Sequence, residues 1–422
     1  HKGHKENYFR VSSCAFVDKI VSNKTKILYL VSIAAFLRSF AQVIYAPSLV
    51  TMRGDLDTNT TMLGLTLSVY GLCLAFSQIA YGPIVDRFDS KRILLIGITV
   101  YALGSLGAFL SHGVEWLIVA RAFQALGIAA AASVGIAMIA DAFPAGERGR
   151  ALGIFSMFNS IGASAAPAAG ALIAVVANWR VDFLVLAVIG FAMAFFTLWQ
   201  LPRTPAHAQR VGMREMWRIA RTPATFGAIV LGLVQFYGVY TVHTLMPVLL
   251  SERLHLHEGA IGIIGSFVAG GVILGTWVGG RAADQRGLRF SLVSGAISAA
   301  FGFALVTALS VIANETTPAP LFAAAIFIYG FAAGFGFAPQ LNIMVDFFPA
   351  QRGTAGALQY FARFSGTTLA PSLGGYLADR IGVSAGFGFA TILLFVGALI
   401  AFATISNPKQ IELPITNNEL PT

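Results

Sequence analysis

The chain has 422 residues, of which 56% are hydrophobic and 11% are charged, and its mean hydropathy is +0.74. Soluble domains of this length do not have such a composition, so we expect a membrane protein. The net charge of +9 follows from where the basic residues fall relative to the membrane, and we expect no nucleic-acid partner. The two cysteines, Cys14 and Cys73, lie before the first apolar segment and inside the second, which excludes a disulfide framework.

Twelve apolar segments follow one another along the chain. Each is long enough to cross a hydrocarbon core of about 30 Å as a helix. We expect membrane-spanning helices at 27–51, 61–84, 91–111, 115–140, 150–176, 181–201, 223–250, 259–281, 289–312, 320–346, 353–377 and 385–405. The predicted fold class is an all-α membrane protein, with the lipid bilayer as its surroundings.

The segments outside these helices divide the chain. Residues 1–25 mix apolar and basic residues and are expected to be a cytoplasmic lead-in, either a short interfacial helix or a flexible segment. Six helices follow in 26–201, and residues 202–222, rich in Arg, Pro and His, form a predicted cytoplasmic linker. Six more helices occupy 223–406. The polar tail at 407–422 is expected to be disordered and cytoplasmic.

The basic residues predict the orientation in the membrane, because Lys and Arg of short loops are retained on the cytoplasmic side. An even number of helices puts both termini on one side. If that side is cytoplasmic, 21 Lys and Arg lie there and four on the other side, while the remaining three of the 28 lie inside predicted helices. We expect a multi-pass protein of a bacterial inner (plasma) membrane with both termini cytoplasmic.

The chain also resembles itself, which is typical of transporter folds. The sequence DAFPA at 141–145, after the fourth predicted helix, corresponds to DFFPA at 346–350, after the tenth. At an offset of 204 residues, Gly162, Ala166, Pro167 and Gly170 match Gly366, Ala370, Pro371 and Gly374. The repeat predicts two pseudo-symmetric six-helix bundles with a substrate path between them.

The loop after the second predicted helix carries a family resemblance. It reads Gly82-Pro83-Ile84-Val85-Asp86-Arg87-Phe88, which is similar to the signature loop of the major facilitator superfamily, although Asp89 stands where the pattern usually has Gly. The resemblance covers essentially the whole ordered chain and implies the major facilitator fold. It implies cytoplasmic gating roles for Gly82, Asp86, Arg87 and their repeat counterparts Asp284 and Arg286. The alternative is that the basic residues of this loop only anchor it on the cytoplasmic side. That alternative leaves the spacing of the Gly and Asp residues unexplained.

The fifth predicted helix is similar to a motif of the twelve-helix drug/proton antiporters, the Bcr/CflA-like group. It carries Gly153, Gly162, Pro167 and Gly170. Small residues let helices pack closely and proline bends them, as a bundle that rocks during transport requires. The resemblance favours export. The alternative explanation of these small residues is ordinary close packing of membrane helices.

Arg121, followed by Gln124 and Gly127 in the fourth predicted helix, resembles a further signature of that group, in which the arginine is implicated in proton coupling. Arg121 lies six residues after Glu115, about 9 Å along a helix. Snorkelling toward the membrane surface is therefore an alternative for this side chain.

Arg38 and Arg363 are expected deeper in the membrane. They lie twelve residues beyond Lys26 and eleven beyond Arg352, or about 18 and 16 Å along a helix. A charge at that depth costs at least ~2.5 kcal/mol, and we expect no Asp or Glu there to pair with it. Because guanidinium groups match carboxylates and phosphates, arginines converging on one cavity predict a substrate with more than one acidic group.

In the resembled family, the first, fourth, fifth, seventh, tenth and eleventh helices line the cavity. With Arg38, Arg121 and Arg363, the predicted substrate-binding residues there are Gln42, Tyr45, Asn159, Tyr237, Tyr240, His243, Gln340, Gln359 and Tyr360. Histidine titrates near neutral pH, so His243 is also a candidate proton carrier, with Arg121 a second coupling residue. A packing role is the alternative for His243.

No metal-ligand spacing, phosphate-binding P-loop or nucleophile-and-base constellation is present in the sequence. We expect no cofactor and no enzyme activity. The predicted function is secondary active transport of a small organic anion, a polycarboxylate or citrate-like siderophore, by a monomer exporting it through proton antiport and alternating access. The alternatives are a polyspecific drug/proton antiporter for neutral or zwitterionic compounds and a transporter-like receptor.

Overall fold

The computed structural model describes residues 24–201, 218–348 and 352–405. Within these ranges the chain forms helices and no strand. Most of the predicted lead-in, most of the predicted linker and the whole predicted tail lie outside the described residues. The first helix covers residues 24–43.

The remaining elements occur in the predicted order, and every predicted span after the first lies inside one helix except at the margins. They are η1 (Ala46–Ser48), α2 (Leu49–Asp55), α3 (Thr60–Arg87), α4 (Ser90–Phe109), α5 (Val114–Ala142), α6 (Ala145–Val176), α7 (Trp179–Gln200), α9 (Pro223–Leu254), α10 (Glu258–Arg286), α11 (Leu288–Ile312), α12 (Ala319–Phe347), α13 (Arg352–Arg380) and α14 (Val383–Thr404).

The first predicted helix, 27–51, is not continuous. The α-helix stops at residue 43, a turn follows, and the chain continues through η1 into α2. Pro47 lies at the beginning of η1, and proline removes a helical hydrogen bond and clashes with the carbonyl four residues before it. The break leaves backbone carbonyls at the end of the first helix without helical partners.

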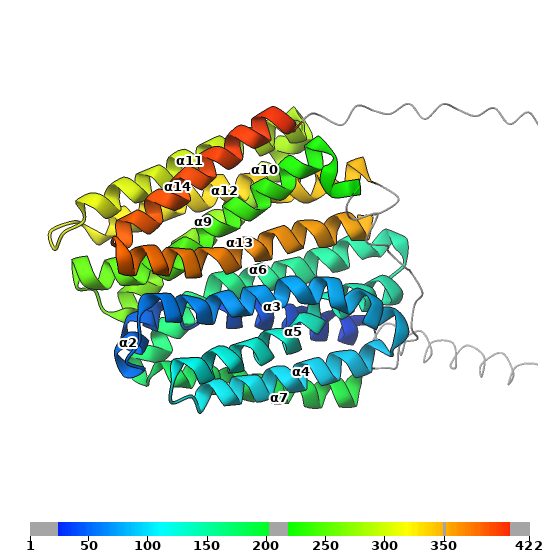
Figure 1. The fold of residues 1–422 in the computed structure, drawn as a ribbon. Helices are drawn as coiled ribbons and strands as arrows, with labels where there is room; N and C mark the ends of the chain where they lie inside the picture. The colour runs from blue at the N-terminus through cyan, green and yellow to red at the C-terminus, as the bar shows by residue number, and fades with distance from the viewer. Residues whose placement is uncertain (1–23, 202–217, 349–351, 406–422) are drawn as a thin grey trace, which may run out of the picture.

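Successive helices run in opposite directions, so the loops gather at two ends of the molecule (Figure 1). One end holds η1, α2, and the loops after α4, α6, α9, α11 and α13; we call it the η1 end. The other holds the loops after α3, α5 and α10; we call it the opposite end. Each long helix thus connects the two ends.

The helices form two halves, residues 24–201 and 218–405, seen as two layers in Figure 1. In the first half α4 packs against α5 and α7, and α3 against α5. In the second half α10 packs on α12, and α9 lies against α13 and α14. The two halves meet where α3 packs against α13 and α6 against α10. This is the predicted pseudo-symmetric arrangement of two six-helix bundles.

Repeat-equivalent glycines allow close helix contacts in the two halves. Gly162 of α6 lies against the backbone carbonyl of Phe36 in the first helix, and Gly366 of α13 lies against the carbonyl of Leu233 in α9. Any side chain larger than hydrogen would collide with these carbonyls. The repeat seen in the sequence therefore corresponds to the same pairwise packing in each half.

Eleven of the described segments, counting residues 24–55 as one, are long and apolar enough to cross a membrane. Their outward faces carry large apolar side chains, such as Val176 at 84% and Trp199 at 73% exposure. The helix outside this set is α13, which has 29 residues and bears Gln359, Arg363 and several Ser and Thr. Packed between α3 and α9, it completes the twelve-helix fold.

Replacing Gly162 by valine should force α6 away from the first helix, since the added atoms meet the carbonyl of Phe36. Overpacking of this kind costs about 1–3 kcal/mol, so we expect a lower thermal unfolding temperature for purified protein in detergent. Gly153→Val in the same helix is the control, because nothing lies within 4 Å of a side chain there. Equal losses in the two variants would contradict the packing argument.

Candidate functional site

Arg121 lies in α5 at the break of the first helix and is fully buried. Its guanidinium donates to the carbonyl oxygens of Ala41 at 2.9 Å, Gln42 at 3.2 Å and Thr66 at 3.4 Å. It also donates to the side-chain oxygen of Gln124. The first two acceptors are carbonyls that the helix break leaves free, so Arg121 closes the end of that helix.

Aromatic rings enclose the same guanidinium. Its central carbon lies 4.1 Å from the ring centre of Tyr70 and 4.9 Å from that of Tyr45. The Tyr45 hydroxyl is hydrogen-bonded to that of Thr66 at 2.8 Å. With its donors bound to protein and its faces covered by rings, Arg121 bonds helices together. The snorkelling alternative does not describe this side chain, which points into the bundle.

Arg38, in the first helix, is 6% exposed. Its Nη2 donates to the Asn159 side-chain oxygen of α6 at 2.5 Å, and Ser39 donates to the same oxygen. Its Nε has no partner among the described residues. The guanidinium lies 5.4 Å from the ring centre of Phe364 in α13, so Arg38 reaches from one half of the molecule to the other.

Arg363 belongs to an amide network in the second half. Its Nη2 donates to the carbonyl of Phe337 at 2.7 Å and to the side-chain oxygen of Gln340 at 3.1 Å. Gln359 donates to the same Gln340 oxygen at 2.9 Å, and Gln340 donates to Gln235. The Nε of Arg363 has no described partner. Three glutamines from α9, α12 and α13 thus orient one arginine.

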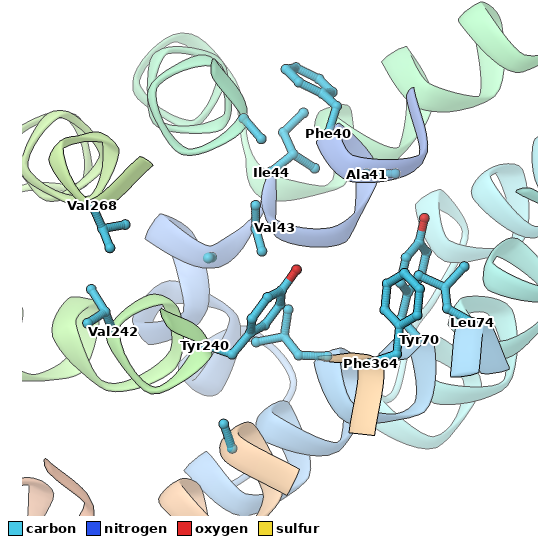
Figure 2. Close-up of a cluster of buried hydrophobic side chains, with 14 of the residues drawn as sticks. Phe40, Ala41, Val43, Ile44, Tyr70, Leu74, Tyr240, Val242, Val268 and Phe364 are labelled. Atoms are coloured by element: carbon cyan, nitrogen blue, oxygen red, sulfur yellow. The ribbon is translucent and has the colours of Figure 1, made fainter. Parts of the chain in front are cut away.

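Arg38 and Arg363 approach the same aromatic pair. Tyr360 and Phe364 stack along α13 with ring centres 6.4 Å apart; Arg38 lies over Phe364 and Arg363 lies 5.9 Å from the ring centre of Tyr360. In Figure 2 Phe364 belongs to a buried cluster with Tyr70 of α3 and Tyr240 of α9. Arginines from the two halves therefore flank one aromatic surface deep in the bundle.

Within the described parts of the chain, Arg38, Arg121 and Arg363 form no ion pair with Asp or Glu. All the acceptors they bind are neutral amides or carbonyls. Two guanidinium groups near Tyr360 and Phe364 thus keep an uncompensated positive charge in a buried setting. Such a site attracts an anion that can approach it.

The other predicted binding residues are distributed unevenly. Tyr240 and His243 are nearly buried and pack ring to ring at 5.7 Å. The side-chain nitrogen of Gln42 has no described partner. Tyr237 packs against Phe389 of α14 at 6.0 Å, away from both arginines' described contacts. Tyr45 packs its ring against the guanidinium of Arg121.

The predicted gating residues lie at the opposite end. Gly82, Asp86 and Arg87 fall in the last turns of α3, and the side chains of this segment lie outside the described residues. Asp284 and Arg286 are exposed at the end of α10. The four motif residues of α6, Gly153, Gly162, Pro167 and Gly170, all lie within one uninterrupted helix.

At the η1 end, polar bonds join the two halves. Arg53 of α2 forms a 2.8 Å ion pair with Glu252 of α9. Glu258, the first residue of α10, accepts hydrogen bonds from the hydroxyls of Ser48, at 3.1 Å, and Thr51. The halves are thereby held closed at this end around η1 and α2.

A second contact closes the same end between α3 and α13. Asp379 accepts from the backbone nitrogens of Thr60 at 3.3 Å and Thr61 at 2.8 Å, and from the Thr61 hydroxyl at 2.6 Å. An acidic side chain at the end of α13 thus caps the beginning of α3. We call these contacts, with those of Arg53 and Glu258, the η1-end closure.

The sequence analysis missed Gln235 and the closure residues Glu258 and Asp379. Gln235 could have been found as an amide inside a long apolar segment, but its repeat partner, Ala35 at an offset of 200, gave no signal. Glu258 and Asp379 lie within one turn of a helix end, where acidic residues are common, so their pattern alone does not distinguish them.

The chain matches the family model of the Major Facilitator Superfamily over residues 31–316 and 228–419. The chain belongs to this family. It is a multi-pass membrane protein and a secondary transporter, and members of the family are transporters and not enzymes.

Curated relatives match over most of their length. The chain is 24% identical over 438 residues to the probable L-galactonate transporter of Escherichia coli (strain K12), covering 95% of this chain and 93% of the relative. It is 26% identical over 339 residues to multidrug resistance protein D of the same organism, covering 80% and 84%. It is 27% identical over 394 residues to the cis,cis-muconate transport protein of Acinetobacter baylyi (strain ATCC 33305 / BD413 / ADP1), covering 89% and 92%.

A solved structure shares the fold. The bacterial homologue of the human lysosomal transporter Spinster, in an inward-facing and unoccupied conformation, aligns with a TM-score of 0.77 at 15% identity, covering 90% of this chain and 97% of that one. The similarity confirms the predicted fold class.

Removing the Arg121 side chain should destabilise the folded protein. Arg121→Ala leaves the buried carbonyls of Ala41, Gln42 and Thr66 without donors, and each such group costs about 1–3 kcal/mol. We expect a large drop in thermal unfolding temperature, partly restored in Arg121→Lys. Arg281→Ala, at an exposed position over Trp277, is the control. Unchanged stability in Arg121→Ala would refute the helix-closing role.

Proposed function

We propose that the chain transports a small organic anion, which binds between Arg38 and Arg363 beside Tyr360 and Phe364. The observation that carries this proposal is the pair of deeply placed guanidinium groups from opposite halves, each with an unpartnered Nε and neither paired with a described acid. Each arginine is the substrate contact of one half, with Asn159, Gln340 and Gln359 orienting the two.

The chemistry of the site favours carboxylates. A carboxylate can accept two hydrogen bonds from one guanidinium, and two guanidinium groups suit a substrate with two or more acidic groups, such as a polycarboxylate or a citrate-like siderophore. Tyr240 and Gln42 provide polar groups for the remainder of the molecule. Two of the relatives are named for organic anions, L-galactonate and cis,cis-muconate, which supports this substrate class.

The proposed membrane orientation puts the η1 end outside a bacterial inner membrane and both termini in the cytoplasm, because basic residues concentrate at the opposite end. With the η1 end closed, the substrate enters from the cytoplasmic side, and opening of the η1 end releases it. We propose export by proton antiport, consistent with the antiporter-like motif of α6. Under this proposal His243, beside Tyr240, carries the proton, and Arg121 takes part in coupling through its bonds to the first helix. The cytoplasmic side is closed by Asp86, Arg87, Asp284 and Arg286. The protein acts as a monomer with a single transport path.

A polyspecific drug/proton antiporter is the second candidate. The similarity to multidrug resistance protein D and the aromatic surroundings of Arg363, with Phe236 and Phe337 each 5.3 Å from its guanidinium, favour it. In this case Arg38 and Arg363 serve chiefly to bond helices, and the rings contact neutral or zwitterionic compounds.

Ligand-induced thermal stabilisation separates the two candidates. Binding to the folded state raises its apparent stability, by about 2.7 kcal/mol when the ligand is at 100 times its Kd. We expect di- and tricarboxylates or carboxylate siderophores to stabilise the purified protein more than monocarboxylates, and cationic drugs not to stabilise it.

The arginine variants test the binding residues themselves. Arg38→Ala and Arg363→Ala should each weaken anion binding about 10- to 100-fold, the loss expected for hydrogen bonds to a charged group, while Arg281→Ala retains it. The comparison uses the shift on adding ligand, so it is independent of each variant's own stability. Stabilisation by neutral or cationic drugs that persists in both variants would favour the second candidate and refute the anion site.

A further inference from the structure

Gln235 of α9 is a member of the amide network that the proposed binding site does not use. Its side chain is fully buried, whereas Arg363 is partly exposed. Within the described residues the amide of Gln235 bonds to Gln340 and to neither arginine of the site. Because a substrate that reaches Arg363 does not reach Gln235, any effect of Gln235 on binding passes through Gln340.

The contacts of Gln340 show how such an effect arises. Its amide nitrogen donates to the side-chain oxygen of Gln235. Its amide oxygen accepts from Arg363 at 3.1 Å and from Gln359 at 2.9 Å. If this amide turned over, its NH2 group would face two donors and its oxygen would face the oxygen of Gln235. The acceptor on Gln235 thus keeps the oxygen of Gln340 directed at Arg363.

The backbone around the network leaves little room for another arrangement. A β-carbon added at Gly232 of α9 would collide with the amide nitrogen of Gln359. One added at Gly336 of α12 would lie 3.4 Å from the amide nitrogen of Gln235. The Tyr329 hydroxyl donates to the backbone carbonyl of Gln235 at 3.0 Å, which ties α12 to α9 at this level. Gln235 is therefore held in place before a substrate arrives.

We propose that Gln235 is a positioning residue for the anion site, and that it acts by holding Arg363, through Gln340, in the orientation that binds the substrate. This inference rests on the proposed anion transport. The Nη2 of Arg363 is engaged by Gln340 and by the carbonyl of Phe337 at 2.7 Å, while its Nε has no described partner. With Nη2 fixed, the guanidinium keeps its orientation and its Nε stays available to a carboxylate.

The effect of Gln235 is confined to the second half of the molecule. Arg38 is oriented by Asn159, whose side-chain oxygen also accepts from Ser39. In the part of the chain that the structure describes, none of these three side chains bonds to the glutamine network. Loss of the Gln235 acceptor therefore weakens the hold on one end of the anion and leaves the other end unchanged.

A double-mutant cycle tests this route from Gln235 to the substrate. Gln235→Met keeps an unbranched side chain and removes the acceptor, since a thioether accepts only weakly. The Kd values of adipate and citrate are measured by isothermal titration calorimetry on the purified protein, on Gln235→Met, on Arg363→Ala and on the double variant.

We expect Gln235→Met to raise each Kd about threefold to tenfold, the effect of losing one hydrogen bond. In the double variant the Kd should equal that of Arg363→Ala within about twofold, because no guanidinium is left to position. A residue that only stabilised the fold would instead weaken binding by the same factor in both backgrounds.

Two controls accompany the cycle. Arg38→Ala removes an arginine that Gln235 does not position, so its effect on the Kd and that of Gln235→Met should multiply in the double variant. Thr241 is fully buried in α9 and donates to the carbonyl of Tyr237 in the same helix at 2.9 Å. Thr241→Val removes a buried polar group of α9 outside the network, so the Kd should stay unchanged.

The inference is overturned if Gln235→Met binds both acids as the parent protein does, if its effect multiplies with that of Arg363→Ala, or if Thr241→Val weakens binding equally. If Gln235→Met does not fold, Gln235→Leu takes its place with the same expectations. Weaker binding in Arg363→Ala with unchanged binding in Gln235→Met refutes the positioning role alone. Absence of binding to the parent protein, or unchanged binding in Arg363→Ala, refutes the anion site itself and this inference with it.

Discussion

The bonding of Arg121 to the broken end of the first helix is the interaction on which the central region depends. Pro47 prevents the helix from continuing, and Arg121 supplies donors to the carbonyls of Ala41 and Gln42 that the break exposes. The break turns the chain through η1 into α2, and these two short elements carry Ser48, Thr51 and Arg53, which bond to the second half in the η1-end closure. A buried arginine thus determines both the path of the first helix and the position of the closure.

Three deep arginines of similar appearance in the sequence consequently have different physical situations. Arg121 has its donors occupied by carbonyls and its faces covered by Tyr45 and Tyr70, which spreads its charge over fixed dipoles. Arg38 and Arg363 each bind neutral acceptors and retain a nitrogen without a described partner. Burial alone does not separate Arg121 from the two arginines proposed to bind substrate; the number of donors already satisfied does.

The sequence predicted the helices, their order and the two-bundle fold, because a span of about 20 apolar residues has one stable form in lipid. It predicted the depth of Arg38 and Arg363 from helical rise alone. The break at Pro47 was foreseeable from the proline but not its closure by Arg121, which depends on the rotation of α5. Glu258 was missed because the sequence places it at a helix end, whereas its bonds to Ser48 and Thr51 depend on how the two halves meet.

The polarity of α13 has a consequence for how the protein is made. Of the long helices in the described ranges, it alone falls short of the apolar character that carries a segment into the bilayer by itself, since it bears Arg363, Gln359 and several hydroxyl side chains. Both of its neighbours α9 and α14 are strongly apolar. The ribosome synthesises α9 before α13, and α14 directly after it. Entry of α13 into the membrane therefore relies on partners that cover its polar face, so the residues proposed for binding also make the last hairpin the most demanding step of biogenesis.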